Sequence, residues 1–155
     1  MLQETITPKE YRHYTFEEYL LLEEKAPYKS EYEKGRILAM SGGTLDHSTI
    51  SQNTGTAISN ALRKKGKTCR VNNSDLKIRI EEYDKAVYPD VSALCGEASH
   101  FNDRKDIITN PLLIIEILSK STRDYDRGTK FKQYRSLPSF KEYVLNEQEI
   151  AKVEV

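Results

Sequence analysis

The stretch that decides the fold is Leu112-Leu113-Ile114-Ile115-Glu116-Ile117-Leu118, an apolar run interrupted by one carboxylate. A short run this rich in aliphatic residues predicts a central strand that is buried on both faces. A buried ionised carboxylate is costly unless it has a partner, so packing alone does not explain Glu116. Functional crevices often lie beside the C-terminal ends of such strands. Glu116 is therefore the first candidate site residue.

A second acid, Asp90, lies in another strand-like run. Pro89-Asp90 falls within the segment 88–95, which we expect to be a strand. Taken alone, Asp90 is explained about as well by a structural role, as an edge-strand acid or the partner of an arginine, as by a functional one. If Asp90 and Glu116 converge, each raises the pKa of the other unless a cation neutralises them. Mg²⁺ fits that role, because it binds carboxylate oxygens and keeps several waters.

A lysine two residues after Glu116 would share its strand face, but that position is Leu118. Two other lysines are candidates for the missing cation. Lys120 is four residues after Glu116, an even spacing that would place it on the same strand face, but it lies in a Ser-rich turn after the strand. Lys130 lies on the next expected helix, and its aliphatic stem can carry the ammonium group to the strand end. Without further information, Lys130 is more simply an exposed helix lysine that pairs with Asp126.

Other polar residues have simpler structural explanations. Ser119, Ser121 and Thr122 can contact a phosphate, but capping of the following helix is the simpler role. His47 is expected to be a surface or capping residue, and no second histidine at ligand spacing suggests zinc. The basic cluster can grip a nucleic-acid backbone, although a solvated helix end is the simpler account. Its members are Arg63, Lys64, Lys65, Lys67 and Arg70.

The hydrophobic pattern predicts an α/β fold with a mixed sheet flanked by helices. Helices are expected over 16–25, from 44 or 46 to 65, and over 124–137. Strands are expected over 31–33, 36–40, 68–72, 76–80, 88–95, 112–118, 140–145 and 150–155. Thr15 and Glu18 form a capping box at the first helix. Lys34-Gly35 is typical of a hairpin turn. Residues 1–14 are expected to form a loose arm.

Length and composition predict one domain over residues 1–155. The 24 basic and 24 acidic residues balance, so the net charge offers no general attraction for nucleic acid and any binding needs a local patch. Cys69 and Cys95 are expected to be reduced thiols of a cytoplasmic protein. We expect neither a secretory signal nor a membrane-spanning segment.

Several stretches together resemble a known family. They are Tyr14-Thr15-Phe16-Glu17-Glu18-Tyr19, Glu31-Tyr32-Glu33-Lys34-Gly35-Arg36-Ile37, Met40-Ser41 with His47, Tyr88-Pro89-Asp90-Val91-Ser92, 114–122, 126–134, Pro138 and Glu142-Tyr143. In this order they resemble the Uma-two family of the PD-(D/E)xK, restriction-endonuclease-like superfamily. The resemblance covers nearly the whole chain. Relatives usually continue with further strands, which implies a short or C-terminally truncated member.

The resemblance implies that Asp90 and Glu116 bind Mg²⁺ or Mn²⁺ and that Glu31 is a further acid near the site. It also implies that Lys130 replaces the strand lysine, because the family usually has an apolar residue at the position of Leu118. The expected function is a metal-dependent nuclease acting on DNA as its partner, with a homodimer as a candidate assembly. The alternatives are a non-catalytic nucleic-acid-binding or protein-interaction module, or phosphodiester chemistry on RNA or a small nucleotide.

Overall fold

The computed structural model describes residues 12–155, so most of the arm expected over residues 1–14 lies outside the described residues. Its α-helices are α1 (Phe16–Glu23), α2 (Leu45–Lys64), α3 (Arg123–Tyr125) and α4 (Phe131–Tyr134). A π-helical turn, η3 (Asp126–Lys130), joins α3 to α4, so these three form one continuous helical segment. Short 3₁₀ turns are η1 (Glu81–Tyr83) and η2 (Phe101–Asp103).

Within residues 12–155, ten strands form two five-stranded sheets, where the sequence pattern predicted one mixed sheet. The first has the order β2 (Arg36–Ala39), β1 (Ser30–Glu33), β5 (Lys85–Val87), β4 (Lys77–Ile80) and β7 (Ile107–Ile108). The second has the order β10 (Val153–Glu154), β9 (Glu142–Glu147), β8 (Leu113–Leu118), β6 (Val91–Cys95) and β3 (Cys69–Asn72). Each sheet contains one parallel pair, β4–β7 or β8–β9, and both are therefore mixed. The α/β class with flanking helices is confirmed.

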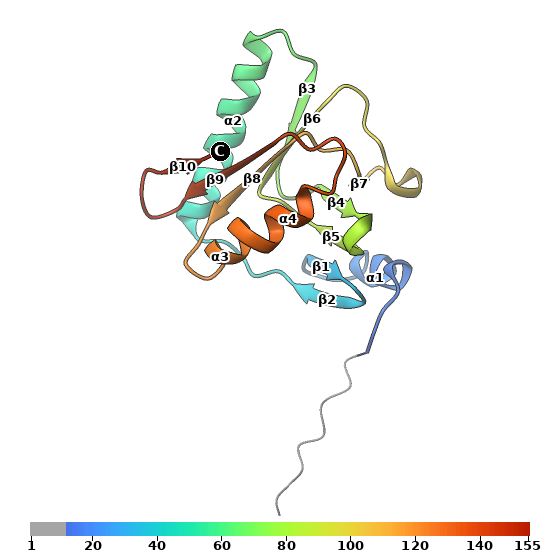
Figure 1. The fold of residues 1–155 in the computed structure, drawn as a ribbon. Coiled ribbons are helices and arrows are strands. Elements are labelled where there is room, and N and C mark those ends of the chain that lie inside the picture. Colours follow the sequence, from blue (N-terminus) through green and yellow to red (C-terminus); the bar gives the residue numbers. More distant parts are fainter. Residues whose placement is uncertain (1–11) are drawn as a thin grey trace, which may run out of the picture.

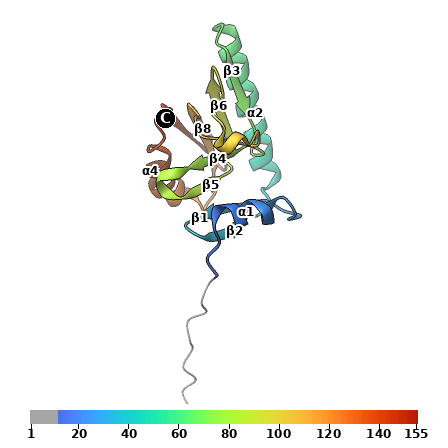
Figure 2. The same ribbon diagram turned by 90° about the vertical axis from the view of Figure 1, so that its right-hand side faces the viewer.

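Strand β8 is the central strand of the second sheet, and all six of its residues are buried, as its apolar run predicts. Leu113, Ile115 and Ile117 pack beneath α2. Ile114 and Leu118 face the opposite way, into the core that contains Tyr134 of α4. Figure 2 shows α2 and α4 on opposite sides of this sheet. Because Glu116 alternates with Ile115 and Ile117, it points toward the helical segment rather than toward α2.

Local sequence signals account for the elements around the first sheet. Thr15 and Glu18 form the expected capping box, and α1 buries Phe16, Tyr19 and Leu20. The β1–β2 turn is at Lys34 and Gly35, whose φ angles of 47° and 83° are typical of a type I′ hairpin. This hairpin lies at the edge of the sheet beside α1 (Figure 1).

Two alternating sets of side chains on β4 separate as expected. Ile78 and Ile80 enter the main core, whereas Lys77 and Arg79 face α1. Both cations are nevertheless buried. The Arg79 guanidinium lies 3.8 Å from the centre of the Phe16 ring and donates to Asp84 at 2.7 Å. Cation–π contact and ion pairing together stabilise a charge that α1 would otherwise desolvate.

The expectation of two reduced thiols is wrong, because Cys69 and Cys95 form a disulfide. These residues lie directly opposite each other on antiparallel strands β3 and β6. Their separation of 26 residues gives no local sign of this pairing. The disulfide ties the edge strand β3 to its neighbour.

No helix among residues 12–155 is both long and apolar enough to cross a bilayer.

Candidate functional site

Lys130 and Glu116 form a buried ion pair. The Lys130 Nζ lies 2.8 Å from Glu116 Oε1, and the two side chains are 11% and 4% exposed. Glu116 Oε1 also accepts a hydrogen bond of 2.9 Å from the Tyr134 hydroxyl. Lys130 ends the π-helical turn η3, and its ammonium group is 3.7 Å from Asp126 Oδ1. The helix lysine therefore faces the strand carboxylate and not solvent.

Lys120, the alternative cation, lies elsewhere. Its side chain is 78% exposed and pairs with Glu149 at 3.5 Å. The hydroxyl groups of Ser119, Ser121 and Thr122 bond to one another in the turn after β8. Thr122 precedes α3, but its side chain makes no capping hydrogen bond there. Of the two candidate lysines, Lys130 contacts Glu116, whereas Lys120 pairs with Glu149.

Asp90 lies one residue before β6, at a bend between β5 and β6. Its Oδ2 accepts a hydrogen bond of 2.8 Å from the backbone N–H of Ile117. His47 Nε2 lies 3.3 Å from the same oxygen. These contacts fasten the carboxylate to strand β8 on one side and to the first turn of α2 on the other.

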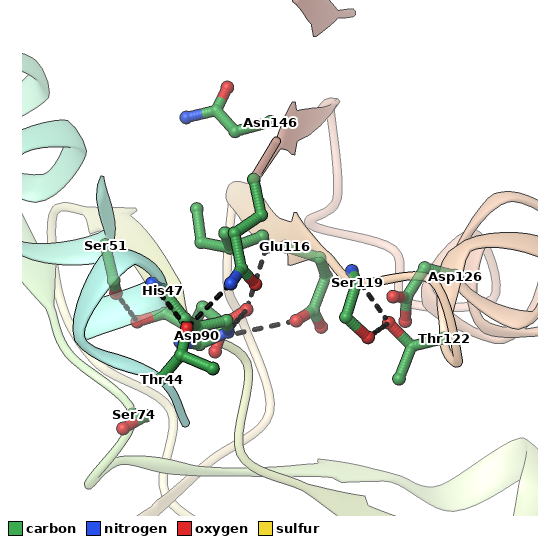
Figure 3. A network of polar contacts seen from close by, with 12 residues as sticks. Thr44, His47, Ser51, Ser74, Asp90, Glu116, Ser119, Thr122, Asp126 and Asn146 are labelled. Carbon is green, nitrogen blue, oxygen red and sulfur yellow. Dashed lines mark hydrogen bonds and ion pairs between the residues drawn. The ribbon is translucent and has the colours of Figure 1, made fainter. Parts of the chain in front are cut away.

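The two candidate metal-binding acids are neighbours. The backbone N–H of Asp90 points to Glu116 Oε2 at 3.5 Å, and Figure 3 shows the two residues side by side. Asp90 and His47 are the more exposed members, with side-chain exposures of 17% and 25%. Solvent therefore reaches the site from the side of Asp90 and α2.

Glu31 lies on β1, at the border of this site. Its Oε1 accepts a hydrogen bond of 3.3 Å from the backbone N–H of Tyr88. Its negative charge is one of those that raise the pKa of Lys130. Glu31 is thus close enough to act electrostatically, whereas the direct partners of Lys130 are Glu116 and Asp126.

Burial and charge give the acids different proton affinities. Burial raises the pKa of Glu116 to about 8, although Lys130 opposes this shift. Burial also raises the pKa of Asp126. Burial alone would raise the pKa of Asp90, but hydrogen bonds from His47 and the Ile117 N–H lower it. The site therefore combines one readily ionised acid with one that retains its proton unless a cation compensates it.

The acids of the site favour the charged forms of its two basic groups. Burial would lower the pKa of Lys130, but the charges of Glu116, Glu31 and Asp126 raise it. The hydrogen bond to Asp90 is the main reason that the pKa of His47 is raised. Each cation thus depends on an acid of the candidate site.

The carboxylates fit a hard divalent cation with few protein ligands. Within residues 12–155, no three His, Cys, Asp or Glu side chains converge as a metal cluster. Mg²⁺ is commonly held by one or two carboxylates, with water in its other positions. Glu116 Oε2 faces Asp90, and Asp90 Oδ1 has no hydrogen-bond partner in the described part of the chain. A cation there would also offset the acidic excess that raises the pKa of Glu116.

Sequence reasoning missed two residues of the site. His47 was assigned to the surface or to a helix cap, whereas Thr44 supplies the cap of α2 and His47 contacts Asp90. Tyr134 attracted no role, although its hydroxyl donates to Glu116. Its spacing of four residues from Lys130 was the available signal, since residues i and i+4 share a helix face.

Comparisons with known proteins identify the family of this chain. The model of the family Uma2, described as "Putative restriction endonuclease", matches residues 16–155. The uncharacterized protein slr1290 of Synechocystis is 44% identical over 131 residues, which cover 83% of this chain and 66% of that protein. The uncharacterized protein sll1609 of the same organism is 33% identical over 140 residues, or 90% of this chain and 78% of that protein.

A solved structure supports the fold. It is described as a putative nuclease belonging to DUF820 from Anabaena variabilis, and it has a TM-score of 0.66 at 19% identity. The match covers 90% of this chain and 83% of that chain. The fold is accordingly restriction-endonuclease-like, and the family match extends over almost all the described residues. This chain belongs to the Uma2 family.

Proposed function

We propose that this protein is a metal-dependent nuclease that hydrolyses phosphodiester bonds in DNA. The observation that carries the proposal is the 2.8 Å contact between Lys130 Nζ and Glu116 Oε1, beside Asp90. It joins two carboxylates and a cation at the end of a central strand. Family membership adds a separate line of support, because the family description names a restriction endonuclease.

In this proposal Asp90 and Glu116 hold Mg²⁺ or Mn²⁺, which supplies Lewis-acid polarisation of the phosphate and a more acidic water. Glu31 assists by orienting a bound water. His47 keeps the Asp90 carboxylate in place through its 3.3 Å contact. Tyr134 keeps the Glu116 carboxyl group in place through the hydrogen bond that its hydroxyl group donates.

The role of Lys130 follows from its charge. Since its pKa is raised by surrounding acids, it keeps its proton at neutral pH and is not a general base in this state. An ammonium group held in a low-dielectric site stabilises negative charge that develops on a phosphate. Lys130 therefore orients the attacking water and stabilises the developing charge.

Cleavage assays test this function directly. Supercoiled plasmid and single-stranded DNA are incubated with Mg²⁺ or Mn²⁺, and wild type is compared with Glu116→Gln. We expect the variant to lose about a hundredfold or more in rate. Glu142→Gln, an exposed glutamate on β9, is the matched control and keeps full activity. Equal cleavage by wild type and Glu116→Gln rejects the assignment.

Calorimetry separates this proposal from a non-catalytic binding module. Wild type should bind Mn²⁺ or Mg²⁺, and Asp90→Asn should bind it at least tenfold more weakly, because one of two carboxylate ligands is lost. If wild type binds neither metal, and if wild type and Asp90→Asn retain DNA equally well, the protein is instead a non-catalytic binding module.

A homodimer is part of the proposal, because two copies would present one site to each strand of a duplex. Light scattering during size-exclusion chromatography measures the mass directly. A protein mass of about 18 kDa, that of one 17.9 kDa chain, both for the free protein and for its DNA complex after the mass of the DNA is subtracted, excludes the dimer.

A further inference from the structure

A polar groove runs along α2 and has no part in the chemistry described above. It has a volume of about 680 Å³ and lies between α2 and the β3–β4 connection. The helix contributes Ser51, Gly55 and Ser59 at four-residue spacing, together with longer side chains that include Gln52 and Arg63. Because these three small residues share one helix face, their side chains leave room for a ligand beside the helix.

The groove offers many uncharged hydrogen-bonding groups. They belong to Gln52, Thr56, Asn60, Asn72 and Asn73. A ligand that carries both hydrogen-bond donors and acceptors would therefore find partners along this groove.

One end of the groove begins at the candidate catalytic site. Ser51 Oγ donates a hydrogen bond of 3.4 Å to the carbonyl oxygen of Asp90. Val91, the next residue after Asp90, also lines the groove. Figure 3 shows Ser51 beside Asp90, on the side of the site away from Asp126. Because this is also the more exposed side of the two carboxylates, a substrate at the site extends naturally along α2.

The other end of the groove is basic. Ser59 and Arg63 also line an adjoining cavity of about 490 Å³, to which Lys67 and Arg70 contribute. All the described residues that line this second cavity are neutral or basic. Asp75 is the one acid lining the first groove in the described chain, and it pairs with Lys29 at 3.2 Å. The positive charge at this end is therefore available to an anionic ligand.

We propose that this groove binds one strand of a nucleic acid and leads it from the candidate catalytic site to Arg63, Lys67 and Arg70. The inference rests on the proposed nuclease function. From Ser51 to Arg63 the helix rises about 18 Å, which corresponds to about five nucleotide steps. Amide and hydroxyl groups bond phosphate oxygens and base edges, and the terminal cations attract the backbone. The ligand class is a phosphodiester strand, of either DNA or RNA.

Fluorescence anisotropy in a chelating buffer tests binding without cleavage. The probe is a labelled single-stranded DNA of about 12 nucleotides, beside RNA of the same sequence and the DNA duplex. The groove variant is Gln52→Ala with Arg63→Ala. The matched control is Asn53→Ala with Lys64→Ala, which makes the same chemical change at exposed positions of α2 outside the groove.

We expect the groove variant to bind single strands about tenfold more weakly than wild type. The control should remain within about twofold of wild type. The Arg63 substitution should also reduce the slope of log affinity against log salt by about 0.7. Stronger binding of DNA than of RNA, or the reverse, identifies the natural strand.

Equal effects of the two variants reduce the binding to general charge attraction and overturn the proposal. It is likewise overturned if wild type binds only duplex, or binds no strand. The two proposals fail separately. Cleavage that depends on Glu116 but not on the groove residues contradicts only the groove proposal. Groove-dependent binding without any cleavage contradicts only the proposed nuclease activity.

Discussion

At the scale of single residues, the buried Lys130 ammonium depends on Glu116 as its acceptor, and an ionised Glu116 depends on Lys130 as its cation. Both are almost fully buried, and their contact distance is 2.8 Å. Burying one such charge alone would cost several kcal/mol. Substitution of either residue should therefore lower the stability of the fold, independently of any effect on catalysis.

A double-mutant cycle measures this dependence. Above pH 8, where Glu116 is ionised, Lys130→Met leaves this carboxylate without its cation and should lower the free energy of unfolding by about 3 kcal/mol. Adding Glu116→Gln removes the unpaired charge, so the double variant should be more stable than the two single costs imply, by about 2 kcal/mol. Urea denaturation provides the values. Lys132→Met, at an exposed position on α4, is the control. Strict additivity would show that the pair is not coupled.

The raised pKa of Glu116 predicts a pH dependence of stability. The folded protein keeps a proton on Glu116 up to about pH 8, whereas the unfolded chain releases it near 4.5. The stabilisation is therefore complete below pH 4.5 and is lost as the pH rises through 8. The free energy of unfolding of metal-free wild type should fall more steeply over this range than that of Glu116→Gln. Parallel pH profiles of the two proteins would contradict the assignment.

At the scale of elements, the helical segment of α3, η3 and α4 sets the position of the cation. The π-helical turn η3 buries both Asp126 and Lys130. π-Helical turns are rare and are often found at functional sites. Gly128 lies within this turn, and a Cβ atom there would meet nothing within 4 Å.

Gly128→Ala should therefore stabilise the protein by about 0.5 kcal/mol, because it restricts the unfolded chain without a clash. Gly66→Ala is the matched comparison. It also points into open space, but its φ of +64° disfavours a side chain. We expect Gly66→Ala to lower the melting temperature and Gly128→Ala to raise it. The same sign for both changes would show that backbone conformation is not the deciding factor.

The disulfide between β3 and β6 predicts a second effect at this scale. It closes a loop of 26 residues, and a loop of this size stabilises by about 3 kcal/mol through the unfolded state. The double variant Cys69→Ser with Cys95→Ser should therefore have a free energy of unfolding lower than that of wild type by about 3 kcal/mol. Wild type should show the same loss of stability in reductant. Thiol titration of the unreduced, denatured protein should find no free cysteine. Two titratable thiols would mean that the strands pair without the bond.

At the scale of the whole molecule, the sequence predicted the elements better than their partners. The capping box at Thr15 and the turn at Lys34-Gly35 are local signals, and both are confirmed. Local alternation cannot specify which strands are neighbours, so the division into two sheets was not predicted. The Cys69–Cys95 pairing was missed for the same reason.

In the candidate site too, local signals in the sequence predicted single residues better than contacts between distant segments. Glu116 was identifiable from its own segment, because a carboxylate within an aliphatic run is costly. The orientation of Lys130 depends on how a helix packs against β8, which no local pattern encodes. The family resemblance, and not spacing, favoured Lys130 over Lys120. The contact of His47 with Asp90 joins residues 43 positions apart and had no sequence signal.

The parallel pairing of β8 with β9 has a consequence for shortening the protein. Every candidate site residue lies before Pro138, yet Leu113–Leu118 is hydrogen-bonded along its whole length to Glu142–Glu147. A fragment that stops at residue 137 would keep all the proposed chemistry and expose one edge of its most apolar strand. Such edges recruit other chains, so this minimal fragment should precipitate on expression while the 155-residue chain stays in solution.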